Sequence, residues 1–293
     1  MLYNNVVGLK GNDKQYMEVL MKRKLILGLA LTLAVTSITG CQAFKKKELK
    51  TATELLKEYN KKDHKNYDAE MVVSVKLEEN NGGQISNIDY NVNSQITRTK
   101  GYGHGNLSTV MNYNSDENAK TYEEYIVDDG EKVILYNYDD MGFWYESLKG
   151  FMYDPEIFVD FMVEDVFKDA ALESNDKGYT VTLALDKAFE NEDFLTVYQE
   201  YTNYYSSVGM DTNLTDAVQE ASKNVNIVYT FDKDFNMTSA KFDEVQANID
   251  DTSEEYIYSI NIVLNAECKY EKNGKIKEAD VKIPEDVLEN LAP

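Results

Sequence analysis

Apolar and polar residues alternate with a period of two through residues 67–148, the pattern of antiparallel strands with one buried and one solvated face. The apolar positions of the first two predicted strands are Ala69, Met71, Val73, Val75, Leu77, Ile88, Tyr90, Val92 and Ile96. Between them, Asn80-Asn81-Gly82-Gly83 predicts a hairpin, because glycine tolerates the positive φ angles of a tight turn. The alternation continues to about six strands, with further turns predicted at Gly101–Gly105 and Asp128-Asp129-Gly130.

Other segments follow the helical period. Leu49, Ala52, Leu55, Leu56 and Tyr59 share one face of a short helix. Asp154-Pro155 predicts the start of a helix that reaches Leu172, because Asp is a good N-cap and Pro fits the first helical position. A strand is expected at 179–186, and helices at 193–208 and 214–222.

The last third of the chain returns to strands. "VNIVYTF" and "TSAKFDEV" flank a turn at Asp232–Asn236, and "YIYSINIVLNAECKY" follows before the short tail "PEDVLENL". No segment rich in Pro, Gly or Ser divides the chain after residue 48, so a single α+β domain is predicted for residues 49–293. Cys268 is expected to face the core from a strand.

The first forty residues have the pattern of a secretory leader. Met21-Lys22-Arg23-Lys24 is basic, and the apolar run Leu25–Ile38 is shorter than the ~20 residues of a membrane-spanning helix. Its end, Ile38-Thr39-Gly40-Cys41, resembles the bacterial lipobox. The resemblance implies cleavage before Cys41 and lipidation of its thiol. An ordinary secretory signal and an N-terminal membrane helix are the alternatives.

The leader divides the N-terminal part of the chain into predicted segments. Residues 1–20 are polar and are expected to be a mis-assigned upstream extension, with translation starting at Met21; a long n-region of the signal that starts at Met1 is the alternative. Residues 21–40 are the signal peptide, and 41–48 form a lipidated basic tether. Two acyl chains hold a protein stably on a bilayer, whereas one does so only marginally. We therefore expect the protein on the outer face of the cell membrane.

The charge of the chain excludes some partners. Residues 1–40 hold five of the 30 basic and two of the 52 acidic residues, which leaves 25 against 50 and a net charge of −25. Nucleic acid is excluded, because binding it requires Lys and Arg against phosphates. The 25 residues that begin at Cys41 contain eight lysines: Lys45, Lys46, Lys47, Lys50, Lys57, Lys61, Lys62 and Lys65. They fit either contact with anionic lipid or a solvated tether.

The order of these elements resembles a family of bacterial lipoproteins. A lipidated cysteine, a short helix, a long meander, interrupting helices and a second set of strands are similar to the LolA, LolB and LppX lipoproteins. "VNIVYTFDKDFNMTSAKFDEV" resembles the central hairpin of small LppX-like lipoproteins of Gram-positive bacteria. The resemblance implies a curved antiparallel sheet, an open half-barrel covered by a few α-helices. It also implies a cavity for lipid or acyl chains.

Two candidate binding surfaces follow from aromatic residues. Phe158, Phe161, Met162 and Phe167 form a stripe that would line such a cavity, with Trp144 and Phe143 at its mouth. A stripe at helical spacing also fits plain core packing. The four tyrosines of Tyr198–Ser207 could instead dock an envelope protein or a wall polymer, or cover a sheet edge.

No catalytic or metal-binding motif stands out. Asp232–Asn236 fits half of a calcium loop, but Met237 occupies the position of the required Gly, so a hairpin turn is favoured. His64 lies among lysines and His104 in the predicted glycine-rich turn, and neither has a partner at metal or nucleophile spacing. We expect a non-enzymatic protein without a metal or cofactor.

Overall fold

The structure is a computed structural model. It describes residues 49–292 except 63, 65, 100, 129–132, 139–141, 148–154, 197–211, 251–257 and 273. Residues Leu49–Asp128 and Val133–Pro293 form one compact unit. The predicted leader, Cys41, the tether and the tyrosines of Tyr198–Ser207 lie outside the described residues, so predictions about them remain predictions.

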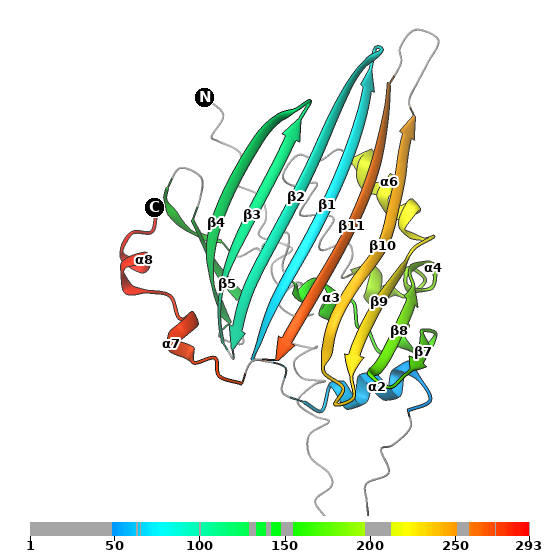
Figure 1. The fold of residues 1–293 in the computed structure, drawn as a ribbon, viewed down its shortest axis with the longest axis vertical. Coiled ribbons are helices and arrows are strands. Elements are labelled where there is room, and N and C mark those ends of the chain that lie inside the picture. The colour runs from blue at the N-terminus through cyan, green and yellow to red at the C-terminus, as the bar shows by residue number, and fades with distance from the viewer. Residues whose placement is uncertain are drawn as a thin grey trace, which may run out of the picture. The chain divides into compact units, whose positions relative to one another are not determined.

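A single antiparallel sheet dominates the described part of the chain (Figure 1). Its eleven strands lie in the order β6-β5-β4-β3-β2-β1-β11-β10-β9-β8-β7, and the two edge strands do not pair, so the sheet is open. The strands are β1 (Tyr67–Asn81), β2 (Gln84–Thr99), β3 (Tyr102–Tyr113), β4 (Asp116–Asp128), β5 (Val133–Tyr138), β6 (Trp144–Ser147), β7 (Ala171–Ser174), β8 (Gly178–Ala184), β9 (Asn226–Asp232), β10 (Met237–Asp250) and β11 (Tyr258–Lys272).

The described helices are short. They are α2 (Ala52–Tyr59), α3 (Glu156–Asp160), the 3-10 turn η1 (Val166–Lys168), α4 (Leu185–Ala188), α6 (Thr212–Ser222), α7 (Glu278–Val281) and α8 (Glu285–Glu289). Residues 192–196 are also helical. The described chain is therefore mostly β, and the α+β class expected from the sequence overstates its helical content.

Strand register defines two faces of the sheet. β1 pairs with β2 on one side and with β11 on the other, which joins the first and last groups of strands. Directly opposed residues share a face, so Val73, Val92 and Ala266 lie together. We call this the inner face and the opposite one the outer face.

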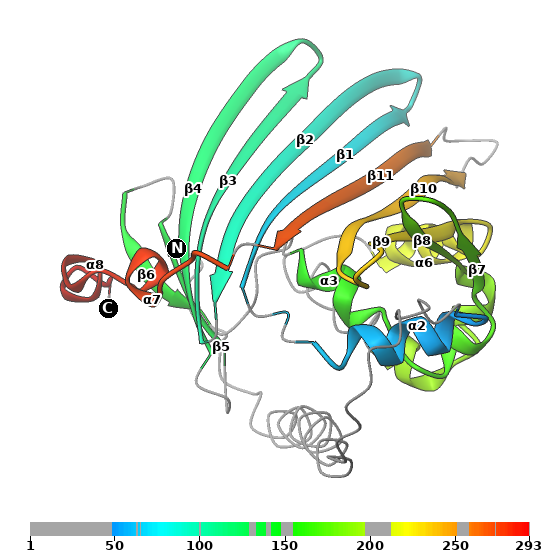
Figure 2. The same ribbon diagram turned by 60° about the horizontal axis from the view of Figure 1, so that its bottom comes forward.

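Helices cover the inner face, and Figure 2 shows α3 and α6 inside the curve of the sheet. The largest buried cluster joins inner-face residues of β1–β4 and β8–β11 to α2, α3 and η1. Beside it, Val218 and Ala221 of α6 pack against a second buried cluster, formed by Ala247 of β10 and Ile260 and Ile262 of β11. The sheet is thus held in its curve by apolar contacts on one side.

Several local predictions are confirmed. All five apolar residues predicted for the first helix are buried in or just before α2. Gly82 and Gly83 turn between β1 and β2 with φ angles of 61° and 86°. Cys268 is buried in β11. The turn after β9 is closed by Asp232, whose carboxylate accepts hydrogen bonds from the backbone amides of Asp234 and Asn236 at 2.8 and 2.9 Å.

The helix predicted from Pro155 to Leu172 is wrong in length. Only α3 and η1 are helical, and β7 begins at Ala171. After α3 the backbone hydrogen bonds span fewer residues than the four of an α-helix. Met162 N–H donates to the Val159 carbonyl, and Val163 N–H donates to the Phe161 carbonyl. The apolar residues of this segment reach the core from a compact turn, which explains why a helical period was present without a long helix.

The turn predicted at Gly101–Gly105 is confirmed only at Gly101, which connects β2 to β3 with a φ angle of 86°. β3 begins at Tyr102, so Gly103, His104 and Gly105 lie within a strand paired on both sides. Glycine is needed here for space. A Cβ at Gly103 would lie 3.1 Å from Cδ of Arg98, and one at Gly105 would lie 3.1 Å from Oε1 of Glu124.

Candidate functional site

The inner face has an apolar strip where β1, β2 and β3 extend towards the β1–β2 hairpin. Two rows of opposed side chains form it: Leu77, Ile88 and Tyr113, and Val75, Tyr90 and Met111. We call these six residues the open strip. Met111 is 37 % and Tyr113 46 % exposed, and Ile88 is half-buried. Val75 and Leu77 pack against the same buried cluster, Ala247, Ile260 and Ile262, as α6 does.

Two tyrosines, Tyr229 fully buried and Tyr270 partly buried, attach α3 to the other part of the inner face. Tyr229 of β9 donates its hydroxyl to the Phe158 carbonyl at 3.2 Å, and Tyr270 of β11 donates to the Pro155 carbonyl at 2.6 Å. Burial raises the pKa of both tyrosines well above the usual value. Both hydroxyls therefore keep the proton that they donate.

The structure brings together four of the five residues predicted to line a cavity. Phe158, Phe161, Met162 and Phe167 are all buried in the main cluster. Their rings contact others: Phe158 lies 5.1 Å from Phe242, and Phe167 lies 5.5 Å from Tyr229 between ring centroids. That they line a ligand cavity stays a prediction.

Trp144 is not brought together with these four residues. Its register through β5 and β4 places it on the outer face, where its ring lies 5.6 Å from that of Tyr125. The C-terminal segment covers this pair: Ile283, Val287 and Leu291 pack against it. Ala292 N–H donates to the Trp144 carbonyl at 2.6 Å.

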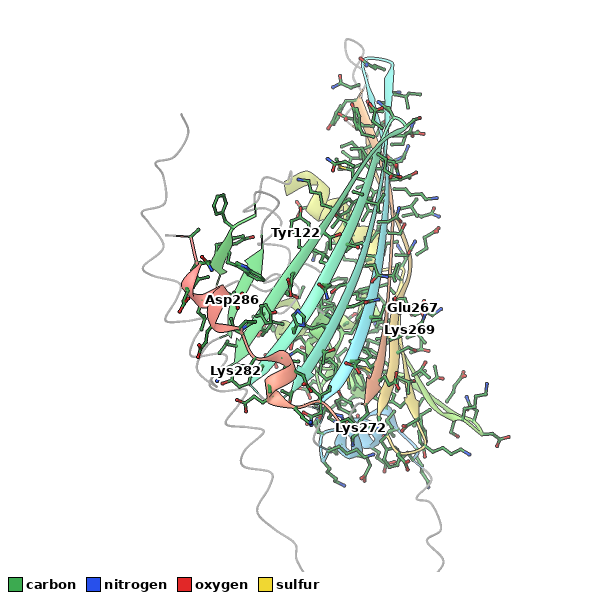
Figure 3. The ribbon with its side chains drawn as sticks, turned by 60° about the vertical axis from the view of Figure 1, so that its left-hand side comes forward. Tyr122, Glu267, Lys269, Lys272, Lys282 and Asp286 are labelled. Atoms are coloured by element: carbon green, nitrogen blue, oxygen red, sulfur yellow. The ribbon has the colours of Figure 1, made fainter. Side chains whose placement is uncertain are left out.

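Tyr125 belongs to a polar cluster that sequence analysis missed. Nε2 of His104 lies 2.8 Å from Oε1 of Glu123, and the Tyr125 hydroxyl donates to the same oxygen at 3.1 Å. Burial, then the charges of Glu123 and Asp286, raise the pKa of Tyr125 to about 12. Figure 3 shows Asp286 and Lys282 on the C-terminal segment, with Tyr122 on the inner side and Glu267 and Lys269 on the outer side.

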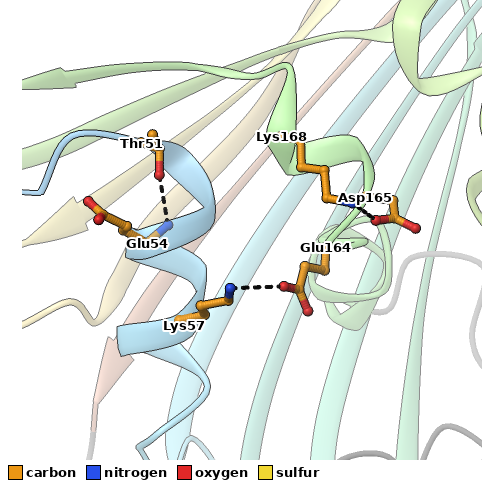
Figure 4. A network of polar contacts seen from close by, with 6 residues as sticks. All are labelled: Thr51, Glu54, Lys57, Glu164, Asp165 and Lys168. Carbon is orange, nitrogen blue, oxygen red and sulfur yellow. Dashed lines mark hydrogen bonds and ion pairs between the residues drawn. The ribbon is translucent and has the colours of Figure 1, made fainter.

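The chain enters the described unit at Leu49, which is buried, and α2 follows at once. Thr51 caps α2 by accepting from Glu54 N–H at 3.2 Å (Figure 4). Lys57 then forms an ion pair of 3.3 Å with Glu164, near η1. Both partners are well exposed, so this pair contributes little stability, and apolar burial fixes α2.

Alternation along β1–β3 was the signal that could have found the open strip. The pattern shows which residues share a face, but it does not show which rows a helix covers. Within the described ranges, no three His, Cys, Asp or Glu side chains converge in the arrangement of a metal site. Nor does any helix of that part have the length and apolarity to cross a membrane.

Known proteins give little guidance. No family model matches the chain, and no curated protein matches it. Among solved structures, an outer membrane lipoprotein-sorting protein domain from Vibrio parahaemolyticus is 8 % identical, with 80 % of this chain and 97 % of that chain covered and a TM-score of 0.26. A DUF1329 family protein from Desulfovibrio piger is 9 % identical, with coverage of 78 % and 94 % and a TM-score of 0.21. Likeness at this level carries no conclusion about function.

Proposed function

We propose that this protein is a non-enzymatic lipoprotein, anchored on the outer face of the cell membrane, which binds a lipid or acyl chain on the inner face of its sheet. The observation that carries the proposal is the open strip. Met111 and Tyr113 expose large apolar side chains in register with Tyr90 and Ile88 respectively, on the same face that packs the core elsewhere. The resemblance of the sequence to LolA, LolB and LppX lipoproteins, with their open half-barrels, supports the same conclusion.

An acyl chain fits this strip energetically. Covering apolar surface stabilises a complex by about 25 cal/mol per Å², and each buried methylene adds about 0.8 kcal/mol. The strip belongs to a rigid sheet paired on both sides of β2, so little conformational entropy is lost on binding. A flexible Met side chain adapts to the irregular contour of a hydrocarbon.

The anchor would keep the described unit close to a membrane, which is a source of lipid. Leu49 lies eight residues after Cys41 in the sequence. At about 3.5 Å per residue they span at most roughly 28 Å, so a lipidated Cys41 holds Leu49 within that distance of the bilayer.

Anchoring is tested by metabolic labelling with a palmitate analogue. We expect the native chain to take up label, because two or more acyl chains at one sulfur are needed for stable attachment. Cys41→Ser should remove the label and release the protein into the medium. Cys268→Ala is the matched control, since that thiol is buried in β11 and should not be acylated. Labelling that persists in Cys41→Ser, or a native chain that never takes up label, would overturn the anchor.

Ligand binding is tested with a fluorescent C16 fatty acid and two charge insertions in the Cys41→Ser chain. Met111→Glu places a carboxylate in the open strip and should weaken binding at least about tenfold, because a charge against hydrocarbon lacks solvation. Val72→Glu is the matched control: Val72 is 43 % exposed on β1, but on the outer face.

Equal weakening by both variants, or none by either, would contradict binding at the strip. A chain that binds no fatty acid at all would favour the second candidate function, a surface protein that docks an envelope protein or a wall polymer.

A further inference from the structure

The two edge strands of the sheet differ in their side chains. Each contains one glutamate, Glu146 in β6 and Glu173 in β7, and the other residues of β7 are small or aliphatic. β6 and the residue before it carry three successive aromatic rings, Phe143, Trp144 and Tyr145, of which Phe143 is 56 % and Tyr145 39 % exposed. Aromatic residues favour strands, and an apolar edge strand pairs readily with another chain. β6 is therefore the edge that needs protection.

A segment of the same chain covers the β6 edge. Leu291 forms an isolated parallel bridge with Trp144, and Ala292 N–H donates to the Trp144 carbonyl at 2.6 Å. The Leu291 side chain packs against the small buried cluster that includes Tyr125 of β4. Figure 2 shows α8, which precedes this segment, near β6. Covering an edge with a helix or loop is one way in which native sheets avoid pairing with other chains. We call residues 291–292 the edge cap.

The edge cap is attached less firmly than the core. α8 has five residues, and the cluster beneath it is formed by Tyr125, Ile283 and Val287, apart from the main buried cluster. Segments with few buried apolar contacts open at a lower free energy than the core does. The cap can therefore leave β6 while the rest of the sheet stays folded.

The bridge shows which backbone groups of β6 point away from β5. The N–H and C=O of one strand residue point to the same side, and successive residues alternate. Because the Trp144 carbonyl points to the cap, Trp144 and Glu146 face outward and Tyr145 faces β5.

This alternation defines how a second copy of β6 would pair. Two copies meet antiparallel about Tyr145, so that Trp144 of one copy exchanges two hydrogen bonds with Glu146 of the other. The two Tyr145 rings then lie directly opposite each other, as a cross-strand aromatic pair. The edge is thus complementary to itself, as the interface of a twofold dimer must be.

We propose that β6 is a self-association edge for a second copy of this chain, and that the edge cap keeps this edge closed. The net charge of −25 on residues 41–293 opposes association only at short range, because exposed charges more than about 8 Å apart are largely screened at physiological ionic strength. Release of the cap therefore converts a monomer into a dimer whose two sheets join at β6.

The test measures the molar mass of the Cys41→Ser chain by size-exclusion chromatography with light scattering. The parent should be a monomer. Leu291→Asp with Ala292→Pro, the capless variant, removes both the apolar contact and the N–H donor of the cap, and it should about double the molar mass. Leu288→Asp is the matched control, because Leu288 is 45 % exposed on α8. The control should stay a monomer.

Glu146→Pro in the capless variant distinguishes pairing at the edge from association of an unfolded chain. Proline removes the outward N–H of residue 146, and a strand tolerates it where that N–H lies on the free side of an edge. This chain should return to a monomer, whereas an unfolded chain would associate with or without the proline. A capless variant that stays a monomer, a dimer that survives Glu146→Pro, or a control or parent chain that is itself dimeric would overturn the proposal.

Discussion

Phe158→Ala is expected to lower the free energy of unfolding by about 3–5 kcal/mol, the usual cost of emptying a buried phenylalanine site. Phe158 is fully buried, and its ring packs on Phe242 of β10. The residue also holds α3 to the sheet, because its carbonyl accepts the Tyr229 hydroxyl. The loss should therefore include both packing on the sheet and the position of α3. Urea unfolding followed by circular dichroism measures it.

Two further variants separate these contributions. Tyr229→Phe removes only the hydroxyl and should cost about 1 kcal/mol, the net value of one hydrogen bond. Ile85→Ala, at a side chain that is 56 % exposed on the outer face, should change stability by less than about 0.5 kcal/mol. A Phe158→Ala chain as stable as Ile85→Ala would show that α3 is not packed as described.

Gly178→Ala is expected to cost about 3 kcal/mol. Gly178 is the first residue of β8 and opposes Asp232 at the end of β9. A Cβ at this position would lie 1.9 Å from the carbonyl oxygen of Phe231 and 2.9 Å from the backbone of Asp232. Because these are backbone atoms of a paired strand, relief requires the β8–β9 ladder to separate locally. Thermal and urea unfolding measure the loss.

Gly274→Ala is the matched control for that substitution. Gly274 follows β11, and no atom lies within 4 Å of the position that a Cβ would take. Its stability should stay within about 0.5 kcal/mol of the parent chain. Equal stability of the two variants would mean that β8 and β9 are not paired in this register.

Sequence patterns predicted those parts of the fold that depend on local chemistry. The hairpin at Gly82-Gly83 follows from the backbone freedom of glycine, and α2 follows from five apolar residues on one helical face. The alternation also placed Val73 and Val92 on one face, as the register confirms. Each of these features is decided within a few residues of the chain.

Features that depend on distant residues were not predictable. Gly103 and Gly105 resemble turn residues, yet they are strand residues that make room for Arg98 and Glu124, which come from two other strands. The pairing of β1 with β11 brings together segments almost two hundred residues apart.

The candidate site also has features that local sequence patterns predict and features that depend on distant residues. The aromatic stripe after Pro155 was recognised, and its residues are buried together. Trp144 was grouped with it by composition, but the register through β4, β5 and β6 turns that ring to the outer face. The open strip was visible as alternation in β2 and β3 and was not recognised as a surface. Only the three-dimensional extent of α6 and α3 distinguishes a covered row from an exposed one.

The central claim is that hydrocarbon covers the strip at Met111 and Tyr113 in the cell. The most direct measurement purifies the full chain from its own membrane, extracts it with organic solvent and identifies the released molecules by mass spectrometry. Acyl chains bound covalently at the anchor remain on the protein in this procedure. About one lipid should be released per native chain, and much less from Met111→Glu. Native protein that releases no lipid, with Val72→Glu and Met111→Glu behaving alike, would contradict it.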